Sequence, residues 1–231
     1  MKHMTMIKTA TLVMMGLLAA GCSTASTGKS ADRPAADSGA AIDDAAAQVD
    51  AAPMGCVYPA GPYGVTVGKI LDPSLQWQGF VPNATTPSTV KITDLYDCDG
   101  KKGINAIVVD SSGQWCIACQ GLARLAPSWF SPKGDNWTKL GVQMITLIIQ
   151  NNNYEPATLT TAQQWRSLFS LNELYVVADP TETFPSPTLP SQLLVNPRTM
   201  KIVHDLSSDT AQTADGADPA VAALATKNKP Q

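Results

Sequence analysis

The sequence predicts an α/β fold, a sandwich with a mixed central sheet, on three observations. Short, continuous apolar runs typical of buried parallel strands alternate with segments whose apolar residues recur at helical spacing. Two further apolar runs near the C-terminus are joined by the turn sequence Asn196-Pro197-Arg198-Thr199, which favours an antiparallel hairpin. Residues 56–231 have the length of one domain and contain no internal repeat. Parallel crossovers followed by a hairpin predict a mixed sheet with helices packed on it.

The first predicted strand–helix–strand unit lies in the middle of the chain. Asn105–Asp110 is a short apolar run, and Val142–Ile149 is a second one that is rich in β-branched residues. Cys119–Phe130, between them, is predicted to be a helix because three of its apolar residues recur at helical spacing. These residues are Leu122, Leu125 and Ala126.

The next helix and strand extend the same pattern. Thr160–Leu171 is predicted to be a helix, with Thr160 or Thr161 as its N-cap. Tyr175–Ala178 follows as a short strand. The helix is expected to pack through one face that carries Trp165, Leu168 and Phe169.

The C-terminal elements are the hairpin and one more helix. The hairpin strands are predicted at Gln192–Val195 and Met200–His204. The last helix is expected to start at Asp218-Pro219 and to run to about Lys227, because proline is favoured at the first helical position.

Residues 1–21 are predicted to be a signal peptide outside the fold. Lys2 and Lys8 form a basic region, and Thr9–Ala20 is an apolar run that is too short to span a bilayer. The sequence Leu18-Ala19-Ala20-Gly21-Cys22 resembles the lipobox of bacterial lipoproteins, which implies cleavage before Cys22 and a diacylglycerol on its sulfur. An ordinary secretory signal is the alternative. With either signal the mature chain is exported. The lipoprotein signal implies a location in the bacterial cell envelope, facing the periplasm, where Ser23 favours the outer membrane.

Residues 22–55 are predicted to be a disordered tether between this anchor and the domain of residues 56–231. The segment is rich in Ala, Ser and Asp and has no aromatic residue, so it cannot bury enough apolar surface to offset the entropy of ordering. A flexible chain of this length reaches roughly 30 Å.

The charge of the chain excludes two classes of partner. The formal net charge is −3, and removal of the signal peptide with its two lysines makes it more negative. Without a cluster of Lys and Arg there is no electrostatic footprint for nucleic acid. There is also no polybasic patch for anionic lipid, so the acyl chains must supply the affinity for the membrane.

The spacing of the cysteines indicates the chemistry. The chain has five, and the lipobox accounts for one. Cys116 and Cys119 form Trp115-Cys116-Ile117-Ala118-Cys119 after a buried strand and at the start of a helix, where unpaired backbone N–H groups and the helix dipole favour a thiolate. Two other interpretations remain open: an inert structural disulfide, and half of a zinc site. The zinc site would need two more ligands from Cys56, Cys98, His204 or acidic residues.

The chain from Tyr63 to His204 resembles the thioredoxin superfamily, in particular the exported, tethered redoxin or TlpA-like branch. Trp115-Cys116-Ile117-Ala118-Cys119 matches the W-C-x-x-C motif of that family. Asp110 stands six residues before the first cysteine, where thioredoxins carry a buried aspartate. Leu189-Pro190-Ser191 directly precedes a predicted strand, where the family has its cis-proline.

The resemblance also has implications for the fold. It implies a thioredoxin-like three-layer sandwich with a mixed central sheet and an N-terminal β-hairpin extension. Three segments before the cysteines resemble that extension, and they are Gly64–Gly68, Trp77–Gly79 and Ile92–Leu95.

The same resemblance implies the roles of the site residues. Cys116 is expected to be the exposed nucleophile and Cys119 the buried cysteine that resolves the mixed disulfide. Asp110 is expected to take the proton of Cys119, and the alternative is a turn residue that bonds Ser111 or Ser112. The cis bond before Pro190 would let the backbone of Leu189 pair with an extended substrate. Trp115 is expected to pack beside the pair, and no cofactor or metal is implied.

The resemblance indicates an envelope thiol–disulfide oxidoreductase. The dipeptide Ile117-Ala118 contains no histidine that would mark a strong oxidant, so a reductase is favoured. The expected partners are thiols and disulfides of exported proteins, including the cysteines of apocytochrome c, and an upstream envelope electron donor. A peroxiredoxin-like peroxide reductase is an alternative, but Val109 and Gly113 stand where that group has its proline and hydroxyl residue. The other alternative function is that of a non-catalytic binding lipoprotein in which the Cys116–Cys119 disulfide is structural.

Two cysteines remain after the motif and the lipobox. Cys56 lies at the N-terminal border of the domain, and Cys98 lies in the turn-like Tyr96–Gly100. In an oxidising envelope they are expected to form a structural disulfide.

Overall fold

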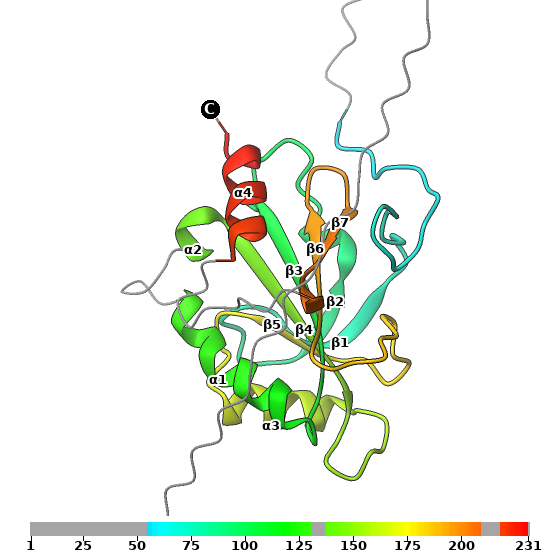
Figure 1. Cartoon of the computed structure of the whole chain (residues 1–231), viewed down its shortest axis with the longest axis vertical. Coiled ribbons are helices and arrows are strands. Elements are labelled where there is room, and N and C mark those ends of the chain that lie inside the picture. The colour runs from blue at the N-terminus through cyan, green and yellow to red at the C-terminus, as the bar shows by residue number, and fades with distance from the viewer. Residues whose placement is uncertain (1–54, 131–136, 209–217, 231) are drawn as a thin grey trace, which may run out of the picture. The chain divides into compact units, whose positions relative to one another are not determined.

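The computed structural model of the chain describes residues 55–130, 137–208 and 218–230 (Figure 1). The predicted signal peptide, Cys22 and all but the last residue of the predicted tether lie outside these residues. Across the described ranges, no helix is both long enough and apolar enough to cross a membrane.

One seven-stranded sheet organises the domain, with strand order β2-β1-β5-β4-β3-β6-β7. The strands are β1 (Gln76–Phe80), β2 (Ser88–Lys91), β3 (Ala106–Gly113), β4 (Val142–Gln150), β5 (Tyr175–Ala178), β6 (Ser191–Asn196) and β7 (Lys201–Asp205). The helices are α1 (Ile117–Phe130), α2 (Trp137–Leu140), α3 (Leu159–Leu168) and α4 (Pro219–Asn228), and the 3-10 turns are η1 (Ile92–Leu95) and η2 (Leu206–Ser208).

The centre of the sheet joins two supersecondary units. β3, α1 and β4 form a parallel β-α-β unit, and β6 and β7 form an antiparallel hairpin that α4 follows. β6 pairs antiparallel with β3, so the two units share one mixed sheet. The prediction of a thioredoxin-like α/β fold is confirmed by this arrangement. An N-terminal hairpin is present as β1–β2, and its strand β1 pairs with β5. Of the three segments predicted for the extension, only Trp77–Gly79 lies in this hairpin, whereas Gly64–Gly68 forms no strand and Ile92–Leu95 is the turn η1.

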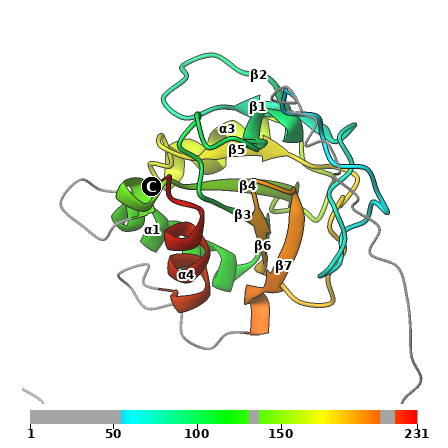
Figure 2. The same cartoon turned by 90° about the horizontal axis from the view of Figure 1, so that it is seen from above.

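The two faces of the sheet are covered differently. Ala106 and Val108 of β3 face a core that contains apolar residues of α1, α2, α3 and α4. Ile107 and Val109 alternate with them and face a second core, built from the N-terminal segment and η1. Figure 2 shows α1 and α4 on one side of the sheet and the N-terminal segment on the other. The sandwich therefore has three layers, but the helices form only one of the two outer layers.

Several predicted boundaries differ from the structure. β3 continues past Asp110 to Gly113, because Ser111 and Ser112 still pair with β4. The N-cap of α3 is Thr158 and not Thr160 or Thr161: the Thr158 hydroxyl accepts the N–H of Thr161 at 3.3 Å, and the Thr161 hydroxyl accepts the N–H of Thr158 at 3.0 Å.

Two leucines that helical spacing placed among core residues are exposed. Leu168 is 73% exposed and Leu125 is 39% exposed. Both lie at the edge of the buried stripe of their helix, which includes Leu122 and Ala126 in α1 and Ala162 and Trp165 in α3.

Arg198 in the β6–β7 turn ties together segments that are far apart in the sequence. Its guanidinium forms an ion pair with the fully buried carboxylate of Asp97 at 3.0 Å. It also donates to the carbonyl oxygens of Ile104 and Asn228, each at 2.8 Å, and to Asn105 Oδ1 at 3.0 Å. The hairpin turn, the loop before β3 and the end of α4 are thereby held as one unit.

Candidate active site

The predicted cysteine pair lies where β3 passes into α1. Cys116 and Cys119 form a disulfide in this structure. The backbone N–H of Cys119 donates to Cys116 Sγ at 3.1 Å, and the N–H of Gln120 donates to the Cys116 carbonyl at 3.0 Å, which starts the helix. The Cys116 sulfur therefore sits at the positive end of α1, where backbone donors stabilise a thiolate once the disulfide is reduced.

The two sulfurs differ in access to the surface. Cys116 is 6% exposed and Cys119 is fully buried. Cys116 lines a groove of about 350 Å³. The other lining residues are Trp115, Ile149, Gln150, Glu182, Ser186, Pro187 and Leu189. A reacting partner that enters this groove meets Cys116 and not Cys119.

Trp115 forms one wall of the groove. Its indole Nε1 donates to Gln150 Oε1 at 2.9 Å, and its ring packs against Tyr154 with the ring centres 4.9 Å apart. The indole also lies over Gly113, where an added Cβ would come within 3.0 Å of Trp115 Nε1. A larger residue at position 113 would push the indole away from the cysteine motif.

Leu189 and Pro190 lie on the opposite side of the motif. Leu189 lines the groove and packs against the core that contains both cysteines. The Leu189–Pro190 bond is cis, and β6 begins at the next residue. Of the three prolines at 185, 187 and 190, only Pro190 follows a cis bond.

Asp110 is buried within β3, on the helix-covered face. It is 2% exposed. It stands two residues after Val108 and so faces the same side of the sheet, toward the core that contains the two cysteines. Ser112 Oγ donates to Asp110 Oδ2 at 3.0 Å, whereas Asp110 Oδ1 has no hydrogen-bond partner. Burial raises the pKa of Asp110 to about 7, and the neighbouring polar side chains of Ser112, Thr146 and Gln192 oppose this rise. Asp110 therefore shows both predicted features: the hydrogen bond with Ser112 that a turn residue would make, and the deep burial expected of a proton acceptor.

Two polar residues beside Asp110 were not anticipated from the sequence. Thr146 of β4 and Gln192 of β6 stand in register with Asp110 on the neighbouring strands, and each is 2% exposed. The Gln192 amide has no hydrogen-bond partner on either its nitrogen or its oxygen. A threonine and a glutamine within apolar strands were the available signal, but only the strand register shows that they flank the same carboxyl group.

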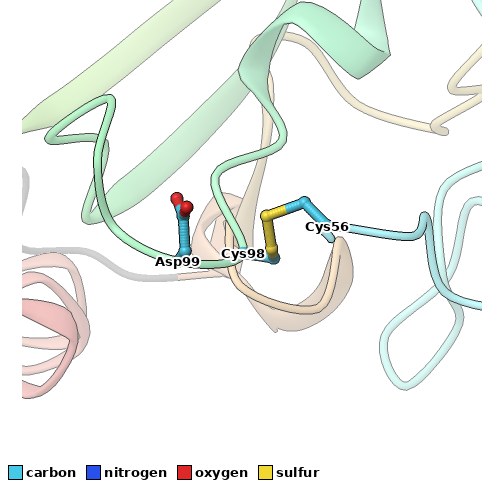
Figure 3. Close-up of side chains that lie close together, drawn as sticks. All are labelled: Cys56, Cys98 and Asp99. Carbon is cyan, nitrogen blue, oxygen red and sulfur yellow. A yellow bond between two sulfur atoms is a disulfide. The ribbon is translucent and has the colours of Figure 1, made fainter. Parts of the chain in front are cut away.

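The second cysteine pair lies at the other end of β3. Cys56 and Cys98 are joined in a disulfide that links the N-terminal segment to the loop before β3 (Figure 3). Cys98 precedes the eight-residue strand and Cys116 follows it, so the strand separates the two disulfides by about 25 Å. The Cys56–Cys98 bond is therefore out of reach of the Cys116 sulfur.

The side chains around the Cys56–Cys98 disulfide are relevant to metal binding. Within the described ranges, Cys56, Cys98 and Asp99 are the only group of three side chains whose ligand atoms lie close enough to hold an ion. Both sulfurs are in the disulfide, and the Asp99 carboxylate pairs with Lys101 at 2.8 Å. Neither Cys116 nor His204 belongs to this group, so the described residues do not assemble the zinc site considered from the sequence.

Comparisons with known proteins give distant similarities. No protein-family model and no curated protein matches the chain. A hypothetical protein from Sinorhizobium meliloti 1021 superposes with a TM-score of 0.48 at 16% identity, over 72% of this chain and 87% of that chain. A thiol:disulfide interchange protein from Bacteroides sp. gives 0.46 at 12% identity, over 70% and 91%. A secreted disulfide oxidoreductase from Mycobacterium tuberculosis gives 0.41 at 16% identity, over 63% and 96%.

Similarities at this level carry no argument about activity. The chemistry of this chain has to be argued from the geometry of its own cysteine pair.

Proposed function

We propose that the chain is a thiol–disulfide oxidoreductase that reduces disulfides of exported proteins through Cys116 and Cys119. One observation carries the proposal. The Cys116 sulfur lies at the N-terminus of α1, accepts the N–H of Cys119 and borders a groove at the surface. A sulfur in this position is stabilised as a thiolate, which is the species that attacks disulfides.

The reaction has two balanced steps. The Cys116 thiolate attacks one sulfur of the substrate disulfide, a mixed disulfide forms, and the other substrate sulfur leaves as a thiolate that takes a proton from water. Cys119 then loses its proton and attacks Cys116 Sγ, which releases the second substrate thiol. The substrate gains two electrons and two protons, and the Cys116–Cys119 disulfide forms. An external dithiol must reduce that disulfide before the next cycle.

Asp110 is the candidate base for the second step. Its carboxyl group lies on the face of β3 that packs against the core containing Cys119, and its pKa of about 7 allows it to exchange a proton near neutral pH. In this role Asp110 takes the proton that Cys119 must lose.

Leu189 supplies the candidate docking edge. It lines the groove beside Cys116 and precedes β6. An extended substrate segment that pairs with its backbone would bring a cysteine against the Cys116 sulfur. This favours substrates whose cysteine lies in an unfolded or extended segment, such as newly exported proteins and apocytochrome c.

The geometry disfavours a peroxiredoxin-like reaction. Val109 faces the core on the side of the sheet away from α1, and at position 113 a side chain would run into the Trp115 indole. Val109 and Gly113 thus supply neither the proline nor the hydroxyl group at these positions.

The proposed location is the bacterial cell envelope, with a lipid on Cys22 and the domain facing the periplasm. The lipobox-like sequence before Cys22 supports the anchor. The reductive direction is supported by the dipeptide Ile117-Ala118, and it requires an upstream envelope electron donor.

Replacement of Cys116 tests the proposed function. With the purified full chain, a protein disulfide as substrate and dithiothreitol as electron source, Cys116→Ser should lose all turnover above the rate of dithiothreitol alone. The variant lacks the attacking thiolate but should keep the thermal stability of the wild-type protein in its reduced form. Turnover of Cys116→Ser near that of the wild type would contradict the catalytic role and favour a binding lipoprotein.

A further inference from the structure

A single carboxylate stands in the groove that leads to Cys116. Of the eight residues that line this groove, Glu182 is the only one with a charge, and it is exposed. In the described part of the chain its carboxylate pairs with no lysine or arginine, and the one hydrogen bond of that carboxylate is the weak one that Gln150 Nε2 donates to Oε1 at 3.4 Å. The groove therefore presents an uncompensated negative charge beside the reacting sulfur.

The backbone of Glu182 is held by a hydrogen-bonded turn. It lies in a turn around the fully buried carboxylate of Asp179, which accepts the Thr183 N–H and hydroxyl at 2.8 Å each and the Thr181 hydroxyl at 3.1 Å. The N–H of Glu182 donates to the Asp179 carbonyl at 3.2 Å, and its φ is +51°. The hydrogen-bonded turn thus sets the backbone of Glu182 at one place in the groove wall, in the left-handed conformation.

Glu182 is also linked to the cysteine motif. Gln150 donates to Glu182 through its amide nitrogen and accepts the Trp115 indole N–H through its amide oxygen at 2.9 Å. Trp115 is the residue directly before Cys116. This chain of contacts places the carboxylate and the aromatic ring on the same wall of the groove, where the ring face can also attract a cation.

The surroundings of the groove are apolar. Ile117, directly after Cys116, is 82% exposed, and Tyr154, which packs on Trp115, is 65% exposed. Pro187 and Leu189 line the other side. A partly apolar groove with one carboxylate fits a polypeptide segment better than a small disulfide that carries carboxylates, such as oxidised glutathione, because the groove lining has no lysine or arginine to pair with them.

We propose that the groove selects polypeptide disulfides in which a lysine or arginine is adjacent to the reacting cysteine, and that Glu182 determines this selection. The proposal rests on the oxidoreductase function proposed above. A groove of about 350 Å³ holds only one or two side chains, so a cation that meets Glu182 must belong to a residue next to the cysteine at Cys116. Glu182 acts on substrate binding and takes no part in bond making or breaking.

Three peptides that differ at one residue test this proposal. Each carries one cysteine in a mixed disulfide with thionitrobenzoate, followed by lysine, glutamine or glutamate. The reduced Cys116 thiolate attacks the peptide sulfur, thionitrobenzoate leaves as a coloured anion, and Cys119 then releases the peptide thiol and forms the Cys116–Cys119 disulfide. Each rate with the purified full chain is divided by the rate with dithiothreitol alone, because the flanking charge also changes the reactivity of the peptide.

The wild-type protein should react with the lysine peptide about two- to five-fold faster than with the glutamine peptide, as expected for one ion pair at a partly exposed site. The glutamate peptide should be the slowest, and 1 M NaCl should reduce the differences. Glu182→Gln should bring the lysine-to-glutamine ratio to about one. Glu173→Gln, which removes an exposed carboxylate outside the groove, should keep the wild-type ratio.

The outcomes separate this proposal from the proposed function. Equal rates with all three peptides, or a preference for lysine that survives in Glu182→Gln, would overturn the selection by Glu182 and leave the oxidoreductase function intact. Failure of the wild-type protein to react with any of the peptides would contradict both.

Discussion

Asp110 is a carboxyl group buried in the sheet beside the cysteine core, and one of its oxygens has no partner. Burial disfavours its charged form and raises its pKa from an ordinary value of 3.8 to about 7. In the interval between these values the folded protein keeps a proton that the unfolded chain releases. The contribution of Asp110 to the free energy of unfolding therefore falls as the pH rises from about 4 to about 7.

Replacement of Asp110 should remove this pH dependence. The difference between the two pKa values corresponds to an upper limit of roughly 4 kcal/mol. Asp110→Asn keeps the shape of the protonated side chain but cannot ionise, so the variant should be more stable than the wild type at pH 8 and similar to it at pH 4. Urea unfolding of the disulfide-bonded form at both pH values measures the change.

Ser112→Ala provides a matched control for Asp110→Asn. It removes the hydroxyl that donates to Asp110 but leaves the titrating carboxyl in place. The pH dependence should persist in this variant, with its upper limit moved to higher pH, because the Ser112 hydrogen bond lowers the pKa of Asp110. An equal pH dependence in Asp110→Asn and the wild type would show that Asp110 does not titrate in this interval.

The elements that the sequence predicted well are those with a strong local signal. Val142–Ile149 contains enough β-branched residues to mark β4 to within one residue, and Asp218-Pro219 marks the start of α4. The W-C-x-x-C motif identified the cysteine pair for the same reason, because its signal lies within five consecutive residues.

The elements that were missed depend on tertiary context. Ile92–Leu95, which the sequence assigned to the N-terminal β-hairpin extension, is instead a 3-10 turn that follows β2, and it covers the second face of the sheet through Ile92 and Leu95. The contact of Arg198 with Asp97 has a sequence separation of 101, and its contact with Asn228 at the end of α4 has a separation of 30. Glu182 was also missed, since a glutamate in a loop becomes a feature of the groove only when the Asp179 turn and β4 bring it beside Trp115.

The Cys56–Cys98 disulfide is a link between elements, and its removal should affect stability but not chemistry. It closes a loop with a sequence separation of 42, for which the chain-entropy model gives a stabilisation of roughly 3–4 kcal/mol. The double variant Cys56→Ser, Cys98→Ser should lose about this much free energy of unfolding and retain the disulfide-reduction rate of the wild type, because β3 separates this bond from Cys116.

Peptide mapping of the unreduced wild-type protein provides the control for this variant. It should recover Cys56 and Cys98 in one cross-linked pair of peptides. Free, alkylatable thiols at both positions in the protein from the envelope would contradict the structural disulfide, and the double variant should then be as stable as the wild type.

At the scale of the whole molecule, a structural disulfide before β3 and a candidate redox disulfide after β3 lie at opposite ends of one strand. The bond at the start of β3 holds the N-terminal segment, through which the domain continues toward the predicted tether and Cys22. The Cys116–Cys119 disulfide follows the end of β3, and its Cys116 lines the groove. A lipid anchor on Cys22 with a tether of roughly 30 Å would confine the groove to a thin layer of the envelope, and only exported partners would reach it.

A trapped intermediate should identify those partners. Cys119→Ser keeps the Cys116 nucleophile and removes the cysteine that resolves the mixed disulfide, so adducts of Cys116 with substrate proteins should accumulate in cells. They should appear on non-reducing gels and disappear on treatment with dithiothreitol. The double variant Cys116→Ser, Cys119→Ser is the matched control and should form none of them, since it lacks the attacking sulfur.

The cysteine captured in these adducts distinguishes the proposed roles. A cysteine within C-x-x-C-H of a c-type apocytochrome would assign the chain to cytochrome maturation, whereas many different secreted proteins would indicate general disulfide reduction or isomerisation. Selection by Glu182 further predicts that basic residues are enriched next to the captured cysteines, and that Glu182→Gln in the trapping variant reduces this enrichment. If no dithiothreitol-sensitive adduct forms in cells although the purified chain reduces disulfides, protein substrates are disfavoured and small disulfides or peroxides become the better candidates, because removal of Cys119 slows the release of a protein captured on Cys116.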